Sequence, residues 1–209
     1  MGNRKIQRKP AGTNFYLIDA CFLVNKYLPF AKIPSSNPER MMVELSQAWW
    51  SEIDGQIKDG KAIVYIPDVC IAESFKVLAQ KYYRQRLFTA AEYRSAKQKL
   101  SDFVHIPART LQGSNRRIKV HDISTSRDII IAVDRFYEFF AKKNLNVSVV
   151  DLIILATAKY LMDFFLIPKK QLYIVTLDNP LWKGTKSLSD IPSAFNPSED
   201  KEKASKVFV

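Results

Sequence analysis

The sequence predicts an α/β fold, a three-layer α/β/α sandwich with a central, mainly parallel sheet. Three short apolar runs, "FYLI", "KAIVYIP" and "QLYIVTL", have the composition of buried strands. Stretches with the apolar spacing of helices separate them, and strands that alternate with helices are typical of parallel sheets. The chain has 209 residues, of which 47% are hydrophobic and 25% charged, which suits one globular domain with a sizeable core.

The first half of the chain supplies two of these strands. The first covers residues 15–18, and a short helical segment follows it. A helix is predicted at residues 38–59, where "NPE" has the order of an N-cap, a first-turn proline and an acid. The second strand covers residues 61–67, and Asp68 directly after it can cap the next helix. The motif "TAAE" has the spacing of a capping box and predicts another helix start at Thr89.

The second half continues the alternation. A strand is predicted at residues 118–123, an amphipathic helix at residues 126–143, and a strand at residues 171–177. The apolar run at residues 149–166 has the length of a membrane span, but three charged residues interrupt it at multiples of four, which favours a central buried helix. Residues 185–209 contain "SEDKEK" and lack apolar periodicity, which predicts an extended arm or a disordered tail.

Charge and cysteine content narrow the function classes. The 32 Lys and Arg residues exceed the 21 Asp and Glu residues, and the formal net charge of +11 favours a polyanionic partner, usually nucleic acid. A protein that is basic for other reasons stays an alternative. Two cysteines without a CxxC motif, and only two histidines, argue against a zinc site or a disulfide framework. The amino-terminal "MGNRKIQRKP" has no apolar core of a secretory signal, so we expect a cytoplasmic protein.

Four acids are placed where strands end or helices begin. Asp19 and Asp178 each follow a predicted strand, Glu73 lies early in the helix after the second strand, and Asp151 lies in the first turn of the apolar helix. Because right-handed crossovers bring the carboxyl ends of parallel strands to one edge, we expect the four carboxylates to meet there. Such crowding needs compensation, and an all-oxygen set of ligands favours Mg²⁺ or Mn²⁺ over Zn²⁺.

Each acid taken alone also has a structural explanation. Asp151 forms a capping box with Ser148 on spacing, Asp178 can be a turn acid before Asn-Pro, and Glu73 can be a solvated helix residue. Asp19 is the hardest to explain in this way, because core-like residues flank it on both sides. The coincidence of four such placements favours a shared site.

Four segments in this order resemble the PIN-domain nucleases, which include the VapC-like toxins of toxin–antitoxin pairs: "YLIDACFLV", "IPDVCIAESFKVL", "SVVDLIILATAKYL" and "LYIVTLD". The resemblance implies a parallel α/β/α domain whose catalytic acids hold magnesium or manganese, and it assigns that function to Asp19, Glu73, Asp151 and Asp178. Thr176 and Ser148 match hydroxyl residues beside these acids. The predicted organisation is a basic N-terminal tail at residues 1–14, a PIN-like domain at 15–184 with an added helix at 38–59, and an arm or disordered tail at 185–209.

The sequence departs from the family pattern in two respects. Cys21 stands where many members have Asn, Ser or Thr, which puts a hydrogen bond beside the site in doubt. The added helix and the C-terminal segment make the chain longer than compact toxins, which weakens the toxin assignment more than the nuclease assignment. A phosphatase with a strand-end aspartate nucleophile is disfavoured, because Cys21 occupies the position of the second acid that such enzymes need.

The resemblance therefore predicts a metal-dependent endoribonuclease that hydrolyses RNA phosphodiester bonds and acts as the toxin of a toxin–antitoxin pair. The alternative is a catalytically inactive PIN-like module that binds RNA or another protein. Structured RNA such as tRNA or rRNA is the expected partner, and an antitoxin protein and a second copy of the chain are further candidates. Candidate RNA-binding residues are Arg84, Arg86, Arg109, Arg116, Arg117, Lys119 and Lys183, with Tyr82 and Tyr83 placed to stack on unpaired bases.

Overall fold

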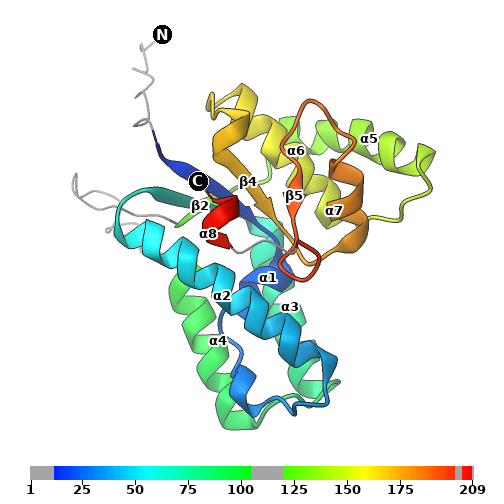
Figure 1. Cartoon of the computed structure of the whole chain (residues 1–209). Helices are drawn as coiled ribbons and strands as arrows, with labels where there is room; N and C mark the ends of the chain where they lie inside the picture. Colours follow the sequence, from blue (N-terminus) through cyan, green and yellow to red (C-terminus); the bar gives the residue numbers. More distant parts are fainter. Residues whose placement is uncertain (1–11, 105–119, 201–203, 209) are drawn as a thin grey trace.

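The computed structural model describes residues 12–104, 120–200 and 204–208 (Figure 1). Within these residues, five strands form one sheet in the order β3-β2-β1-β4-β5, and every neighbouring pair is parallel. This confirms the predicted parallel sheet. The strands are β1 (Asn14–Ile18), β2 (Ala62–Pro67), β3 (Val120–Ile123), β4 (Leu172–Val175) and β5 (Ala194–Phe195).

Helices connect the strands, and most begin at the predicted signals. They are α1 (Ala20–Asn25), α2 (Pro38–Lys58), α3 (Asp68–Tyr83), α4 (Ala90–Val104), α5 (Arg127–Lys142), α6 (Val149–Asp163), α7 (Asn179–Thr185) and α8 (Ala204–Val207), with short 3-10 helices η1 (Phe30–Lys32) and η3 (Lys169–Gln171). The expected capping box before α4 is present, since Thr89 and Glu92 exchange hydrogen bonds. The expected cap at Asp68 is not formed. This residue is already the first of α3, and its carboxylate accepts hydrogen bonds from the N–H of Val69 and from Thr125 beyond β3.

The strand order places a switch of direction between β1 and β4. The chain runs outward from β1 through β2 to β3, then returns to the other side of β1 to form β4 and β5. Because such crossovers are right-handed, α1 to α4 cover one face of the sheet and α5 to α7 cover the other. Figure 1 shows α2 and α4 on one side of the strands and α5, α6 and α7 on the other. Ligand sites of open α/β sheets form at such a switch point, outside the carboxyl ends of the strands.

The core contains the central strand β1 and the helix α6. Every residue of β1 is buried, and α6 has an uninterrupted buried run from Leu152 to Ala158. This confirms that the apolar segment around residues 149–166 is a core helix. Among the described residues, no helix combines the length and apolarity needed to span a membrane.

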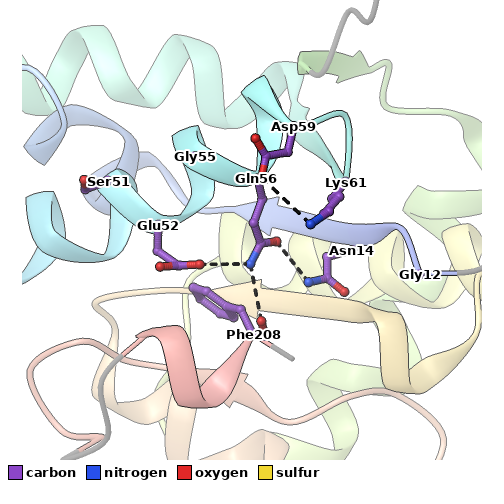
Figure 2. A pocket seen from close by; sticks show the side chains of 9 residues that line it. All are labelled: Gly12, Asn14, Ser51, Glu52, Gly55, Gln56, Asp59, Lys61 and Phe208. Carbon is purple, nitrogen blue, oxygen red and sulfur yellow. Dashed lines mark hydrogen bonds and ion pairs between the residues drawn. The ribbon is translucent and has the colours of Figure 1, made fainter.

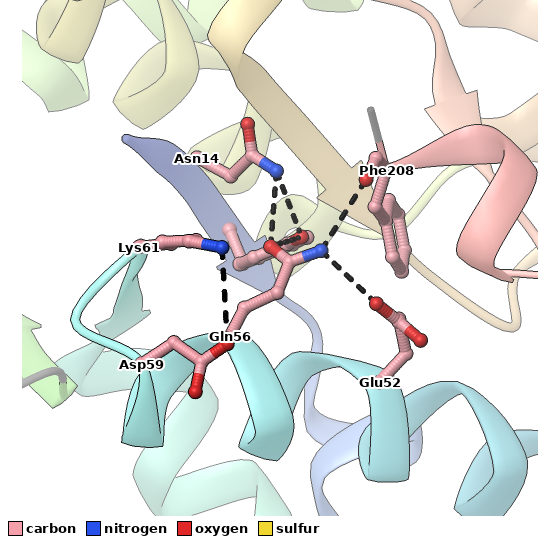
Figure 3. Close-up of polar contacts among 7 residues, drawn as sticks. Asn14, Glu52, Gln56, Asp59, Lys61 and Phe208 are labelled. Carbon is pink, nitrogen blue, oxygen red and sulfur yellow. Dashed lines mark hydrogen bonds and ion pairs between the residues drawn. The ribbon is translucent and has the colours of Figure 1, made fainter. Parts of the chain in front are cut away.

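The described part of the C-terminal segment is an arm that packs on the sheet. Its strand β5 pairs with β4, and the ring of Phe208 is buried against Tyr16, Trp49 and Tyr173, with ring centroids 4.8, 5.1 and 5.2 Å away. Gln56 on α2 donates a hydrogen bond to the carbonyl oxygen of Phe208 (Figure 2). Figure 3 shows that the same amide also joins Asn14 and Glu52, so the arm is fixed at the amino end of β1, opposite the predicted acidic edge.

Candidate functional site

Asp19 lies where β1 passes directly into α1, and local and distant groups hold its carboxylate. Its backbone N–H donates to the carbonyl of Val175 at 3.1 Å, so the residue continues the pairing with β4. Oδ1 accepts a hydrogen bond of 2.6 Å from the N–H of Phe22 and caps α1. Oδ2 accepts bonds from the Thr176 hydroxyl at 2.5 Å and from the Leu177 N–H at 2.9 Å. The side chain that interrupts the apolar run is therefore buried, at 5% exposure, but well hydrogen-bonded.

Asp178 occupies the corresponding position after β4. It caps α7, with Oδ1 accepting a 2.6 Å hydrogen bond from the N–H of Leu181. Its own N–H donates to the Thr176 hydroxyl at 2.9 Å. The fully buried Thr176 therefore bridges the two acids, because the same hydroxyl donates to the Asp19 carboxylate and accepts from the Asp178 backbone. The two strand ends at the switch point share one hydrogen-bonded unit.

Asp151 lies on α6 in the capping box that its spacing predicts. Its Oδ2 accepts hydrogen bonds from the N–H and the hydroxyl of Ser148, at 2.9 and 2.7 Å, and its N–H donates back to that hydroxyl. The capping bonds use only one carboxylate oxygen, so Oδ1 stays free of them. The structural explanation of Asp151 is therefore real, and it leaves one oxygen for another ligand.

Glu73 lies in the second turn of α3 and is half-buried. Its carboxylate accepts no hydrogen bond from any other residue that the structure describes. Lys76, one turn further along α3, lowers the pKa of this carboxyl electrostatically, but burial outweighs that effect and the pKa is raised overall. Glu73 thus differs from the three aspartates, because no hydrogen bond from the described part of the chain holds its carboxylate.

The pKa values indicate that the four acids share one electrostatic environment. Burial raises the pKa of Asp19 to about 6, against the effect of its three hydrogen bonds, and the charge of Asp151 raises it further. Burial also raises the pKa values of Asp178 and Glu73, and Asp151 again adds to both. Because the carboxylate of Asp151 acts on the other three, the fold brings the predicted acids to one edge, where their charges destabilise one another.

Chemistry and geometry give different answers on whether this set suits a metal ion. Four carboxylates are the donors that Mg²⁺ and Mn²⁺ prefer, and a divalent cation would offset their mutual repulsion. Within the described parts of the chain, however, no three His, Cys, Asp or Glu side chains stand in an arrangement that could hold a metal ion. The donor types therefore fit a hard divalent cation, whereas their present positions do not form a ready-made coordination site.

Cys21 follows the site in the first turn of α1, with an exposed side chain. Although the side chain reaches the surface, the protein around its sulfur displaces water and raises the pKa of the thiol, and the charges of Asp19, Glu73 and Asp151 add to this, while Lys81 acts in the opposite direction. The thiol therefore stays protonated at neutral pH. A protonated thiol is a weak hydrogen-bond donor, so Cys21 can serve the acids only weakly in place of Asn, Ser or Thr.

The predicted RNA-binding residues are divided between two places. Lys183 is exposed on α7, the helix that Asp178 caps, and Arg84 and Arg86 are exposed just beyond the end of α3. The other predicted residues, Arg109, Arg116, Arg117 and Lys119, lie outside the described residues. A further exposed cation of α3 is Lys76, whose charge acts on Glu73 and which the sequence pattern did not single out, whereas Lys81 is buried and pairs with Glu39 at 2.6 Å. The spacing of Lys76 from Glu73 along the helix was the signal that could have identified it.

Comparison with known proteins gives no matching family model and no matching curated protein. Among solved structures, a chain of FitAB bound to an IR36 DNA fragment is similar with a TM-score of 0.50 and 14% identity, covering 90% of this chain and 98% of that one. VapBC2 from Rickettsia felis bound to a DNA fragment of its promoter gives a TM-score of 0.49 and 12% identity, covering 87% of this chain and 98% of that one. FitAcB from Neisseria gonorrhoeae gives a TM-score of 0.49 and 15% identity, covering 88% of this chain and 99% of that one. At these identities the likeness to the FitAB chain concerns the fold alone, and together with the sheet order it shows that this chain has a PIN-like α/β/α fold.

Proposed function

We propose that this chain is a divalent-metal-dependent endoribonuclease whose active site is the acidic edge between β1 and β4. The observation that carries the proposal is the Thr176 hydroxyl, which ties together Asp19 and Asp178 at a switch point of the sheet. A buried carboxylate with a raised pKa, close to further acids at such a point, is a recognised feature of active sites. The net charge of +11 supports a polyanionic substrate.

The hydrogen bonds still leave acceptor positions on the aspartates for a metal ion. Oδ2 of Asp178 takes no part in its capping bond, whereas both oxygens of Asp19 accept hydrogen bonds and Oδ1 keeps one further lone pair. Asp19 and Asp178 would be direct ligands of Mg²⁺ or Mn²⁺, and Asp151 would contribute its Oδ1 directly or through water. Glu73, whose carboxylate accepts no hydrogen bond from another described residue, would be a further ligand or would orient the attacking water. A bound divalent ion would lower the pKa of that water and neutralise charge on the scissile phosphate.

The remaining residues of the site hold the acids in position or attract the phosphates of the substrate. Thr176, Leu177 and Phe22 hold the Asp19 carboxylate in one orientation, so it loses little conformational freedom on binding an ion. Ser148 fixes Asp151 at the start of α6 in the same way. Lys183 is exposed on α7 and contributes positive charge for the phosphates of a bound RNA.

A narrower form of the proposal makes the chain the toxin of a toxin–antitoxin pair, with an antitoxin protein as its partner. Its support is the likeness to a chain of FitAB and the exposed apolar side chains of Ile130, Ile131 and Tyr137 on α5, which suit a protein partner. Co-expression with a short open reading frame beside the gene tests it. Growth arrest that the neighbouring product relieves is expected, and arrest that it leaves unchanged contradicts the toxin assignment.

The second candidate function is a PIN-like module that binds RNA or protein without cleaving. One observation favours it: three of the four acids serve as helix caps, and no three of them are assembled for a metal among the described residues. On this alternative the acids stabilise helix starts, and the positive charge provides binding alone.

Cleavage assays with matched substitutions separate the two functions. We would incubate the protein with labelled tRNA and rRNA in Mg²⁺, in Mn²⁺ and in EDTA, beside Asp19→Asn and Asp178→Asn. Asparagine caps helices about as well as aspartate, so these variants remove charge while keeping the caps. Asp163→Asn is the control, because this exposed acid of α6 pairs only with Lys159. Cleavage that needs metal and both site acids supports the nuclease. Cleavage in EDTA contradicts it, and binding without cleavage in every metal supports the module.

A further inference from the structure

A hollow of about 370 Å³ lies at the far end of α3 from Glu73, and aromatic rings dominate its wall. It is lined by Tyr82, Tyr83, Arg86, Phe88, Thr89 and Ala90. Its size falls at the lower end of the range for small-ligand sites. The acidic edge makes no use of it, since ten residues of helix separate Glu73 from Tyr83, which corresponds to about 15 Å.

The rings of this hollow form a preformed stack with one open face. Tyr82 stacks on Tyr93 with centroids 4.6 Å apart and planes at 10°, and on Phe88 at 6.1 Å and 24°. Tyr83 closes one side edge-on to both tyrosines. Phe88 is buried, but Tyr83 is 67% exposed, so a large apolar ring is presented to solvent beside a rigid stack. A flat π-system is the group that such a surface accommodates.

The backbone at this place is held in an uncommon conformation. Arg86 has φ of 51°, in the left-handed region where residues other than glycine are rare. Two hydrogen bonds maintain it, from the N–H of Arg86 to Tyr82 and from the N–H of Leu87 to Lys81, and the turn brings Phe88 back to Tyr82. These two bonds have the pattern of a Schellman cap that ends α3, and the cap places Arg86 in the wall of the aromatic hollow.

Positive charge surrounds the hollow and extends toward the acids. Arg84 and Arg86 are exposed beside it, and Lys76 is exposed on the α3 surface between Tyr83 and Glu73. Lys76 lies on α3 itself, and the two arginines follow directly after the end of that helix. The acid on the neighbouring helix, Glu92, is already engaged by Thr89 in the capping box. The local charge thus complements a phosphate backbone, which favours a nucleic acid over an apolar segment of a protein.

We propose that this hollow is a subsite for an unpaired base of single-stranded RNA, which stacks on Tyr83 while Arg84 and Arg86 hold the flanking phosphates. The inference rests on the proposed ribonuclease function and specifies which RNA it takes. A strand anchored here extends along Lys76 toward the acidic edge, so the site selects RNA with an unpaired base about 15 Å along α3 from Glu73.

Binding in EDTA tests the subsite without any cleavage. The probe is a single-stranded oligoribonucleotide with 2-aminopurine at one position, whose fluorescence falls when the base stacks. We expect quenching on binding to the full chain, and a rise in Kd of about 5- to 150-fold with loss of the quenching in Tyr83→Ala. Tyr83→Trp should keep both the affinity and the quenching of the unmodified chain. Tyr137→Ala, which removes a similarly exposed tyrosine from α5, is the matched control and should change neither. Arg86→Gln should lower the slope of log Kd against log salt by about 0.7.

The outcomes distinguish this inference from the proposed nuclease. Tyr83→Ala that binds and quenches like the unmodified chain overturns the subsite, and so does an equal Tyr83 dependence for the duplex of the same sequence. Absence of binding to every oligoribonucleotide also overturns it, and leaves the aromatic hollow to a protein partner. Binding that depends on Tyr83, without cleavage in any metal, supports the subsite and contradicts the nuclease. Cleavage in Mg²⁺ with binding independent of Tyr83 supports the nuclease and overturns the subsite.

Discussion

The carboxyl group of Asp19 should make the stability of the metal-free protein fall as the pH rises. Its pKa is raised from an ordinary 3.8 to about 6, mainly by burial, so the folded chain holds this proton more tightly than the unfolded chain does. The resulting stabilisation is complete below pH 4 and is lost as the pH rises through about 6. Because one pKa unit corresponds to 1.36 kcal/mol, Asp19 alone contributes a loss of about 3 kcal/mol between these limits.

The contribution can be isolated by comparison with Asp19→Asn, which is neutral throughout. We would measure the free energy of unfolding in urea at pH 4, 5, 6 and 7, in EDTA, by tryptophan fluorescence. Any cost of the altered hydrogen bonds is independent of pH and does not change the slope. The difference between unmodified chain and variant should fall by about 3 kcal/mol from pH 4 to pH 7, or about 6–12 °C in Tm.

Metal addition extends the same experiment. If a divalent ion binds through Asp19, Mg²⁺ or Mn²⁺ should stabilise the unmodified chain more at pH 7 than at pH 5, and should stabilise Asp19→Asn less. Parallel pH profiles for the two proteins in EDTA would refute the reasoning about the buried charge. A pH-dependent difference that metal leaves unchanged would refute only the metal site.

Three further predictions concern packing and the bridge between the acids. Gly184→Ala on α7 places a Cβ 2.1 Å from the ring of Phe140, so the free energy of unfolding in urea should fall by about 1–3 kcal/mol. Gly55→Ala on α2, with nothing within 4 Å of the added Cβ, should raise it by about 0.5–1 kcal/mol. A neutral Gly184→Ala would contradict the close approach of α7 and α5. Phe208→Ala should lower the midpoint of thermal unfolding, with a cost of about 3–5 kcal/mol, because the ring is buried against β1, α2 and β4; an unchanged midpoint would mean that the arm adds little to the fold. Thr176→Val should abolish most RNA cleavage and lower the free energy of unfolding at pH 7 by about 1.5–3 kcal/mol, whereas Thr176→Ser should keep both the activity and the stability. Equal cleavage activity in the two variants would exclude the bridge.

Hydrogen bonds between residues close in the sequence were predictable, whereas bonds between residues far apart were not. The capping boxes at Thr89 and Ser148 were predictable, because their hydrogen bonds join residues three positions apart. The expected cap at Asp68 was not formed, because α3 already begins at this residue, and its carboxylate also binds Thr125, 57 positions away in the chain. Local patterns identify a residue near a helix start, but they do not reveal such a distant partner.

The candidate site was predictable in composition and only partly in arrangement. Strand ends and helix starts marked Asp19, Glu73, Asp151 and Asp178, because parallel topology brings such positions to one edge. The pattern gave no means of deciding how the carboxylates are arranged, and in the described residues they do not form a ready-made metal site. Side-chain positions at an edge depend on packing between helices, which periodicity does not specify.

The sequence by itself determined the parallel α/β class, the buried character of β1 and α6, and the helix starts, because these follow from periodicity and from bonds within one turn of chain. Only the tertiary structure decided that Thr176 bridges Asp19 and Asp178, since that requires β4 to lie beside β1 across 157 positions. It also decided that Phe208 packs into the core and that the turn at Arg86 brings Phe88 back onto Tyr82. Contacts of this kind depend on which elements become neighbours, and that is fixed by the packing of the whole sheet.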